Sequence, residues 1–146
     1  MSAWEDTITV LAVTAAPDEA AFLDTLAGRT RWKIERVCSV VEAASFMAHN
    51  DVAVVLCSAT LPDGNWKDVL ASVSSRGGRA RVIVLASGSD DHIWSEVLDS
   101  GGYDVLAKPF DTTEAVRVIS LAWRQWRDSA ARAGGAGTDA GVPTTK

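Results

Sequence analysis

The stretch RVIVLASGSDDHIWSEVLDSGGYDVLA (81–107) decides the fold class of this 146-residue chain. Its first six residues form an apolar run rich in β-branched side chains, and a stretch with helical spacing follows. A Gly-Gly pair then leads into a second apolar run at 104–107. Parallel strands need a crossover of a dozen or more residues, usually a helix. The stretch therefore predicts a βαβ unit in an α/β sheet.

The same pattern occurs five times along the chain. The apolar runs are TITVLAVT (7–14), KIERVC (33–38), VAVVLC (52–57), RVIVLA (81–86) and DVLA (104–107). Nearly continuous apolar character in the first, third and fourth runs indicates central strands covered on both faces, whereas the second run alternates and indicates an edge. The pattern predicts an α/β fold, a doubly wound five-stranded parallel sheet of flavodoxin-like order 2-1-3-4-5 with helices on both faces.

Helix start and stop signals separate the strands. Pro17 opens the first helix, and Ser39 with Glu42 forms a capping box for the second. Asn65 precedes the third helix and Asp111 the fifth, while residues 89–91 start the fourth. In the fifth helix, large apolar residues form the stripe expected to pack on the sheet, namely Val116, Ile119, Trp123 and Trp126.

Composition excludes several function classes. The net charge of −5 repels a phosphate backbone, so we expect no direct binding of nucleic acid. No apolar run reaches the roughly 18 residues of a membrane span, and Glu5 and Asp6 interrupt any signal-peptide start. Both cysteines, Cys38 and Cys57, lie in apolar runs, which indicates buried thiols. We therefore expect a cytoplasmic protein without membrane contact.

The length indicates one domain with short flanking segments. We assign residues 1–6 to an N-terminal extension and residues 7–127 to the folded domain. Residues 128–146 contain four glycines, no aromatic side chain and little to bury, which predicts a disordered C-terminal tail.

Ligands of doubly wound sheets bind beyond the carboxyl ends of the strands. Thr14 follows the first strand here, Ser58 the third, Ala86 the fourth and Lys108 the fifth. No carboxylate stands at a strand end, and Mg²⁺ prefers several oxygen anions. We therefore expect neither a metal site nor a cofactor.

Two motifs resemble one known family. GGYDVLAKPF (101–110), followed by an amphipathic helix, resembles the end of a response-regulator receiver domain, and LPDG (61–64) resembles that family's third loop. The resemblance covers about residues 7–127 and implies a two-component signalling or phosphorelay role. It also implies a cis peptide bond before Pro109.

The resemblance also shows what this chain has lost. Working receivers bind Mg²⁺ through two acidic residues after the first strand and one aspartate at the end of the third, and that aspartate accepts a phosphoryl group. Here the acidic pair falls on Thr14 and Ala15, and the acceptor falls on Ser58. The switch Ser/Thr falls on Ala86, with Ser87 next to it. Lys108 alone is retained, so the chain resembles a degenerate receiver.

These departures predict a module that is not an enzyme and is not switched by aspartyl phosphorylation. A serine hydroxyl without a base or a metal is a poor phosphoryl acceptor. The alternative is a phosphoryl-accepting switch that uses Ser58 or Asp63, and a third hypothesis is anion binding at Lys108. Of these, we expect a stand-alone module that acts by binding proteins.

Receivers commonly dimerise or bind targets through the face formed by helix 4, strand 5 and helix 5. Helical spacing leaves apolar side chains off the buried stripes of both helices, and arginine and aromatic residues are favoured anchors. The alternative is scattered surface hydrophobics without a partner. We expect a homodimer or a signalling partner to contact Ile93, Trp94, Arg117, Val118, Leu121 and Arg124.

Overall fold

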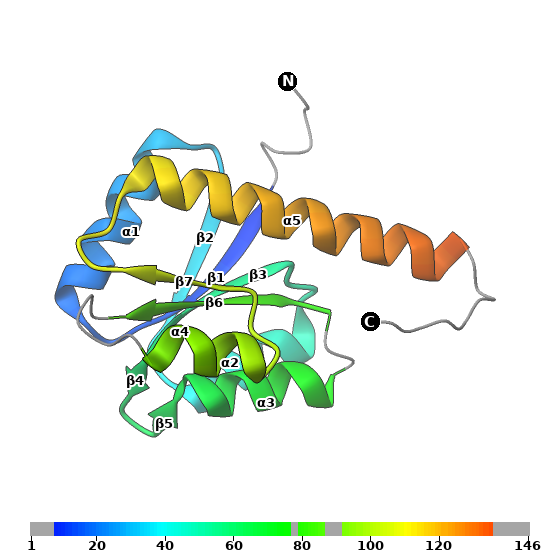
Figure 1. Cartoon of the computed structure of the whole chain (residues 1–146), viewed down its shortest axis with the longest axis horizontal. Helices are drawn as coiled ribbons and strands as arrows, with labels where there is room; N and C mark the ends of the chain where they lie inside the picture. The colour runs from blue at the N-terminus through cyan, green and yellow to red at the C-terminus, as the bar shows by residue number, and fades with distance from the viewer. Residues whose placement is uncertain (1–7, 77–78, 87–91, 136–146) are drawn as a thin grey trace.

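The computed structural model describes residues 8–76, 79–86 and 92–135. Five parallel strands form one sheet in the order β2-β1-β3-β6-β7 (Figure 1). Their bounds are β1 (Thr9–Val13), β2 (Lys33–Val37), β3 (Val54–Ser58), β6 (Arg81–Ala86) and β7 (Asp104–Ala107). This is the order predicted from the sequence, and β2 is the predicted edge strand.

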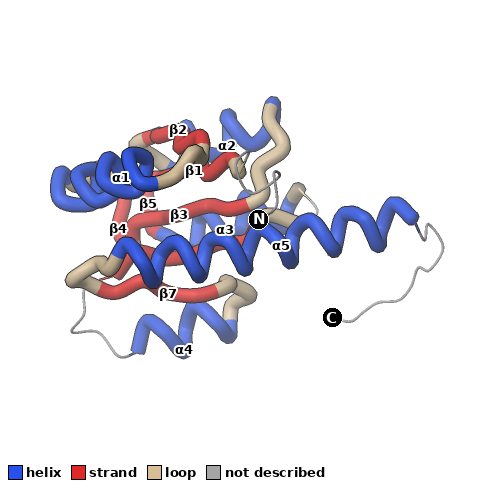
Figure 2. Tube along the Cα trace, turned by 90° about the horizontal axis from the view of Figure 1, so that it is seen from above, coloured by secondary structure: helices blue, strands red, loops and turns tan. Residues whose placement is uncertain are grey.

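Helices cover both faces of the sheet, as predicted. Their bounds are α1 (Pro17–Arg29), α2 (Val40–His49), α3 (Trp66–Ser75), α4 (His92–Asp99) and α5 (Thr112–Gly135). α1 and α5 pack on one face over side chains such as Val10, Val54 and Ile83. α2, α3 and α4 pack on the other face over the alternate strand residues, such as Leu11 and Val55. Figures 1 and 2 show these two layers on either side of the sheet.

The predicted helix starts are largely confirmed, although Glu42 Oε1 accepts from Cys38 N instead of closing the predicted capping box on Ser39 N. Ser39 Oγ accepts a hydrogen bond from Glu42 N (3.1 Å) at the start of α2. Asn65 and Asp68 form a full capping box at the start of α3. The predicted start of α4 at residues 89–91 lies outside the described residues, and the described helix begins at His92.

A short hairpin between β3 and α3 was not predicted. It pairs β4 (Thr60–Leu61) with β5 (Gly64–Asn65), so the LPDG motif forms its turn. At Gly64, a Cβ atom would lie 2.3 Å from Asp68 Oδ2, an oxygen that also caps α3. Any larger residue at Gly64 therefore displaces that cap.

The last helix continues past residue 127, where the sequence placed the end of the folded domain. α5 continues through Gly135, and Ser129 Oγ accepts a hydrogen bond from Arg81 Nη2 (2.9 Å). Contact with a strand end thus extends the helix where composition alone indicated a tail. The remainder of the predicted tail, residues 136–146, and the N-terminal extension, residues 1–6, lie outside the described residues.

The predicted exposure of Val118 is also wrong, since this side chain is buried. The buried face predicted for α5 was placed from its large apolar residues alone and left out two alanines. Ala115 and Ala122 are fully buried, and small side chains let a helix approach its neighbours closely. They turn the buried face of α5 toward Val118.

The two cysteines differ, although both were predicted to be buried. Cys57 lies inside β3 and is buried, as predicted. Cys38 is exposed, because β2 ends at Val37 and forms the edge of the sheet.

Among the described residues, no helix combines the length and the apolar character that a membrane span requires.

Candidate functional site

Parallel pairing brings the predicted site residues to one edge of the sheet. Val13 pairs with Cys57, Ser58 with Leu85, and Ala86 with Ala107. The next residues along the chain, Thr14 and Lys108, therefore lie beside Ser58 and Ala86, at the carboxyl ends of the strands. We call this edge the rim. Ser87, the other predicted member, lies outside the described residues.

A carboxylate that sequence analysis did not assign to the site lies buried in the rim. Glu19, in the first turn of α1, is only 6% exposed. Thr14 Oγ1 donates a hydrogen bond to Glu19 Oε1 (2.5 Å), and Ser58 Oγ donates to the same oxygen. Burial of a carboxylate is costly unless donors surround it. The two hydroxyls supply that compensation, and both are buried with it.

Lys108 does not face an empty pocket either. Its Nζ lies 2.5 Å from Asp18 Oδ2, and both side chains are partly exposed. Hydrogen bonding to Asp18 raises the pKa of Lys108, and the same hydrogen bond lowers the pKa of Asp18. Lys108 is therefore paired with an acidic side chain of its own chain.

No carboxylate stands at a strand end, as the sequence indicated, but the first turn of α1 brings two carboxylates to the rim. The sequence indicated Pro17 as the start of α1 but not where the next two side chains, Asp18 and Glu19, project. The position of Pro17 could have located these carboxylates. It starts α1 three residues after Thr14, so the first turn of the helix lies at the ends of β1 and β3. Two carboxylates in that turn follow shortly after Thr14 and Ala15, the positions that the resemblance matches to an acidic pair.

Ala15 itself contributes no polar group. It is exposed and lines a shallow groove at the ends of β1 and β2, whose other walls include Pro17, Arg36 and Cys38. The Arg36 guanidinium pairs with Asp24 (3.5 Å) rather than with the rim.

Cys57 borders the buried carboxylate from β3. Burial and the nearby charge of Glu19 both raise the pKa of its thiol. A neutral thiol is a weak nucleophile. Cys57 is therefore a packing residue beneath the rim.

Asp63, the alternative phosphoryl acceptor, is engaged elsewhere. Its carboxylate accepts hydrogen bonds from Val40 N (2.8 Å) and Val41 N (3.1 Å), at the start of α2. The hydrogen bonds from these two amides lower the pKa of Asp63. Asp63 thus caps α2 from the β4–β5 turn, and both of its carboxylate oxygens are engaged there.

The strand that carries Lys108 leaves the sheet as the resemblance implied. The Lys108–Pro109 peptide bond is cis, and Lys108 N donates to Ala86 O (3.0 Å). Phe110 then packs against Phe22 of α1, with ring centroids 4.7 Å apart.

Within the described ranges, no three His, Cys, Asp or Glu side chains gather in a way that could hold a metal ion.

The predicted interface residues divide between surface and core. Trp94 is 54% exposed and Leu121 is 38% exposed, as predicted, and Arg117 and Arg124 are exposed on α5. Ile93 was wrongly predicted to be available, because with Val97 it forms the buried side of α4. Leu98, which sequence analysis did not select, is 48% exposed one turn beyond Trp94.

Comparisons with known proteins agree with this fold. No family model matches the chain. The response regulator protein PilR of Pseudomonas aeruginosa is 25% identical over 114 residues, which are 78% of this chain and 26% of PilR. The transcriptional regulator NtrC of Rhizobium meliloti is 25% identical over 113 residues, 75% of this chain and 23% of NtrC. The chain therefore spans about a quarter of the length of these curated relatives.

Solved receiver domains superpose on most of the chain. The signal receiver domain of an HD domain-containing protein from Pseudomonas fluorescens has a TM-score of 0.78 at 20% identity, covering 86% of this chain and 93% of that one. The beryllofluoride-activated NtrC4 receiver domain dimer has a TM-score of 0.73 at 18% identity, covering 81% and 98%. The chain has the fold of response-regulator receiver domains, as the lysine-proline-phenylalanine ending predicted.

Proposed function

We propose that this chain is a receiver-fold signalling module of a two-component system that binds proteins and is not switched by aspartyl phosphorylation. One observation carries the proposal. The side chain at the acceptor position, Ser58, donates its hydroxyl to the buried carboxylate of Glu19. In this state the hydroxyl is inaccessible and faces a negative charge.

The chemistry of phosphoryl transfer supports this proposal. Transfer requires an available acceptor oxygen and cationic groups that neutralise the charge on the transferred group. Glu19 repels an incoming phosphoryl group, and the charge of Lys108 is already met by Asp18. The polar and charged side chains at the rim thus pair with one another within the chain. On this proposal the module is not an enzyme.

The surface beside β7 is the proposed binding face. α4 and α5 flank this edge strand and expose the apolar side chains of Trp94, Leu98 and Leu121. Tryptophan and arginine are the residues that most often anchor protein interfaces, and Arg117 lies on the same helix as Leu121. The NtrC4 receiver, a similar fold, is described as a dimer. We propose a second copy of this chain or a signalling protein as the partner.

Intact mass after incubation with a small-molecule phosphodonor, with and without Mg²⁺, tests the phosphorylation part of the proposal. We expect no added phosphoryl mass under either condition. A stable Mg²⁺-dependent adduct contradicts the proposal. The variants Ser58→Ala and Asp63→Asn then show which of the two alternative acceptors carries the adduct.

Self-association measured by sedimentation across micromolar concentrations tests the binding face. The variant Trp94→Lys removes a large exposed apolar group, and we expect it to shift any dimer toward monomer by at least tenfold in dissociation constant. Val41→Lys is the matched control, because Val41 is 70% exposed on α2 and away from β7. Equal effects of the two substitutions contradict the assignment of the face. If the wild type is monomeric, the same pair is compared for binding to a candidate signalling protein.

A further inference from the structure

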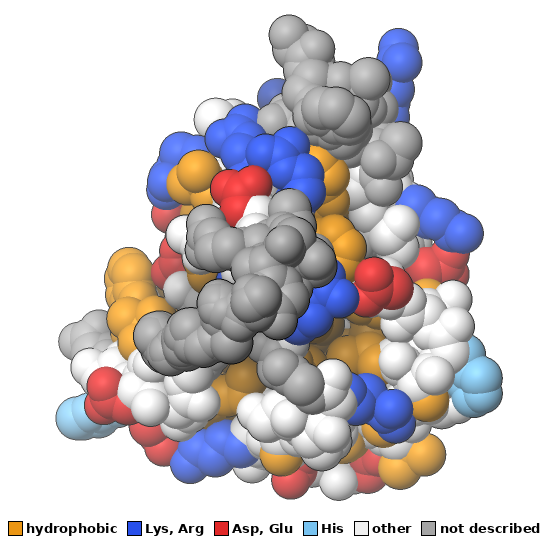
Figure 3. Space-filling view, turned by 90° about the vertical axis from the view of Figure 1, so that its right-hand side faces the viewer, with side chains coloured by type: hydrophobic (Ala, Val, Ile, Leu, Met, Phe, Trp, Pro, Cys, Tyr) orange, Lys and Arg blue, Asp and Glu red, His pale blue; other side chains and the backbone are white. Residues whose placement is uncertain are grey.

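Arginine side chains stack on tryptophan rings near the amino ends of the strands, at the opposite edge of the sheet from the rim. The Arg79 guanidinium carbon lies 4.9 Å from the ring centroid of Trp126, and that of Arg127 lies 5.1 Å from the ring centroid of Trp123. Both distances are typical of cation–π contacts. We call these four residues the arginine–tryptophan surface. Figure 3 looks at this end of the molecule and shows Lys and Arg side chains beside hydrophobic ones in its upper half.

Stacking holds the two guanidinium groups in place at the surface. Trp123 is buried and Trp126 is half-buried, whereas the side chains of Arg79 and Arg127 are nearly half exposed. The rings therefore support charged groups that remain open to a partner. A guanidinium that already lies against a ring loses less side-chain freedom when it binds, and its planar N–H groups match the two oxygens of a carboxylate.

The carboxylates that already lie near these arginines hold them weakly. Arg79 Nη1 lies 4.0 Å from Asp51 Oδ1, which is too long for a hydrogen bond. Arg127 Nη2 lies 3.4 Å from Oδ1 of its sequence neighbour Asp128. Both aspartates are mostly exposed, and exposed ion pairs of this kind contribute little to stability. Another carboxylate can therefore compete for the same guanidinium groups.

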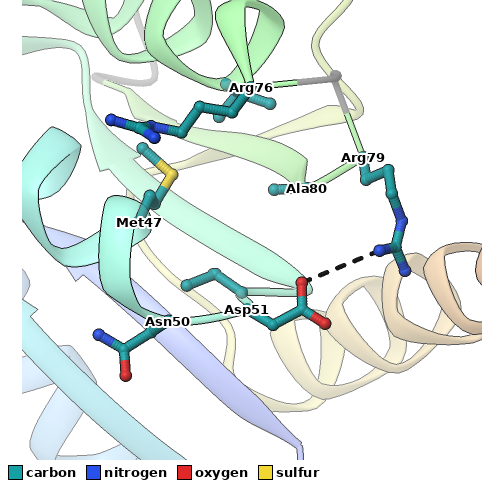
Figure 4. A pocket seen from close by; sticks show the side chains of 8 residues that line it. Met47, Asn50, Asp51, Arg76, Arg79 and Ala80 are labelled. Atoms are coloured by element: carbon teal, nitrogen blue, oxygen red, sulfur yellow. Dashed lines mark ion pairs between the residues drawn. The ribbon is translucent and has the colours of Figure 1, made fainter.

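A pocket opens beside Arg79. It encloses about 100 Å³. Figure 4 shows Arg79 on one side of this pocket, turned toward Asp51, and Arg76 on the other side. An apolar cavity of roughly 150 Å³ accepts benzene, so this pocket has room for a smaller group such as an aliphatic side chain. Its apolar wall consists of Met47, Val52, Val73 and Ala80.

The surface and the pocket together indicate the chemistry of a ligand. The arginines favour negative charge, and the pocket beside Arg79 favours an apolar group next to that charge. A protein segment with carboxylates on both sides of an aliphatic side chain carries both. A phosphate backbone has no such apolar group, and the net charge of −5 repels it at long range.

We propose that the arginine–tryptophan surface and the adjoining pocket bind an acidic segment of a partner protein. One carboxylate of this segment pairs with Arg79 and another with Arg127, and an aliphatic side chain beside them enters the pocket. Tryptophan and arginine are frequent anchors of protein interfaces. This contact goes beyond the proposed function, because it uses other residues than the binding face beside β7.

A labelled acidic peptide tests the site on the full chain. The probe is about ten residues long and carries glutamates on both sides of a leucine, and its fluorescence anisotropy reports binding. We expect a dissociation constant below about 100 μM. Arg79→Gln and Arg127→Gln are each expected to weaken binding about fivefold, as for a partly exposed charge-assisted hydrogen bond. Alanine in place of the leucine of the peptide is expected to weaken binding by about the same factor, because the pocket loses its apolar occupant.

Matched variants separate this site from a general charge effect. Lys33→Gln removes a positive charge at the start of β2, and Trp94→Lys alters the binding face beside β7. Neither is expected to change the dissociation constant by more than about twofold, since charges beyond a Debye length of about 10 Å are largely screened in 0.1 M salt. An effect of Lys33→Gln equal to that of Arg79→Gln overturns the proposal.

The remaining outcomes identify other occupants. Absence of binding by the wild type overturns the proposal, and so does equal binding of a peptide with glutamine in place of every glutamate. Tighter binding of an inorganic polyphosphate of the same charge overturns the choice of a protein segment. Wild-type self-association that Arg79→Gln abolishes, measured by sedimentation, also overturns it, because the occupant is then a second copy of this chain.

Discussion

The hydroxyl of Ser58, at the end of β3, is held by the carboxylate of Glu19, which comes from the first turn of α1. Thr14 donates to the same oxygen from the end of β1 (2.5 Å). One helix side chain thereby joins two neighbouring strands at the edge of the sheet where this fold places ligands. The carboxylate at the rim is thus supplied by the helix and not by a strand end.

Replacement of Glu19 tests how much this junction stabilises the fold. Glu19→Ala leaves two buried hydroxyls without an acceptor, and we expect the free energy of unfolding in urea to fall by about 2–4 kcal/mol. Glu19→Gln keeps one acceptor oxygen in place and is expected to cost about half as much. Glu35→Ala, on the exposed edge strand, is the control. A Glu19→Ala variant as stable as this control contradicts the assigned hydrogen bonds.

The ion pair between Asp18 and Lys108 predicts a defined pH dependence. The hydrogen bond from Lys108 lowers the pKa of Asp18 in the folded state below its ordinary value of 3.8, so the unfolded chain binds more protons there. The stabilisation is fully present above pH 3.8 and is lost as the pH falls through the lower folded-state pKa. The stability difference between wild type and Asp18→Asn is therefore expected to shrink in acid.

At high pH the same pair behaves in the opposite sense. Asp18 raises the pKa of Lys108 in the folded state above its ordinary value of 10.5. The stabilisation from the ion pair is therefore fully present below pH 10.5 and is lost as the pH rises through the folded-state pKa of Lys108. Thermal unfolding from pH 2 to pH 12 follows both losses, with Asp99→Asn as the control for charge. A difference between wild type and Asp18→Asn that does not change with pH rules out the pair as a source of stability.

Two neighbouring positions on α5 predict opposite outcomes. Val118 is 3% exposed, so Val118→Ala is expected to lower the free energy of unfolding by about 2 kcal/mol through lost burial and the cavity left behind. Leu121 is 38% exposed, and Leu121→Ala is expected to stay within about 0.5 kcal/mol of wild type. Urea unfolding of the two variants compares them directly. The reverse order of effects contradicts the burial of Val118 on the inner face of α5.

The sheet order and the receiver-like ending could be predicted because both depend on local patterns. Strand runs that are apolar throughout must be covered on both faces, and the residues between them carry helix caps such as Ser39 and Asn65. The cis bond before Pro109 accompanied the family motif. Strands, helix caps and this motif each depend on residues that are close together in the sequence, so residue type and spacing are enough to predict them.

The errors share a different cause. Val118 and Ile93 were misplaced because the rotation of a helix on its sheet depends on which small residues, such as Ala115, permit close approach. The end of α5 was placed too early because Arg81 binds Ser129 across 48 positions of sequence. Neither fact is visible in a local window.

The sequence by itself determined the five βα units, their order, and the absence of carboxylates directly at the strand ends. Only the tertiary structure decided which side chains meet at that edge of the sheet. The Oε1 atom of Glu19 meets Ser58 across 39 positions, and Lys108 meets Asp18 across 90. Such pairs form only after the sheet has brought distant segments to one edge, because the interaction depends on distance in space and leaves no periodic trace in the chain.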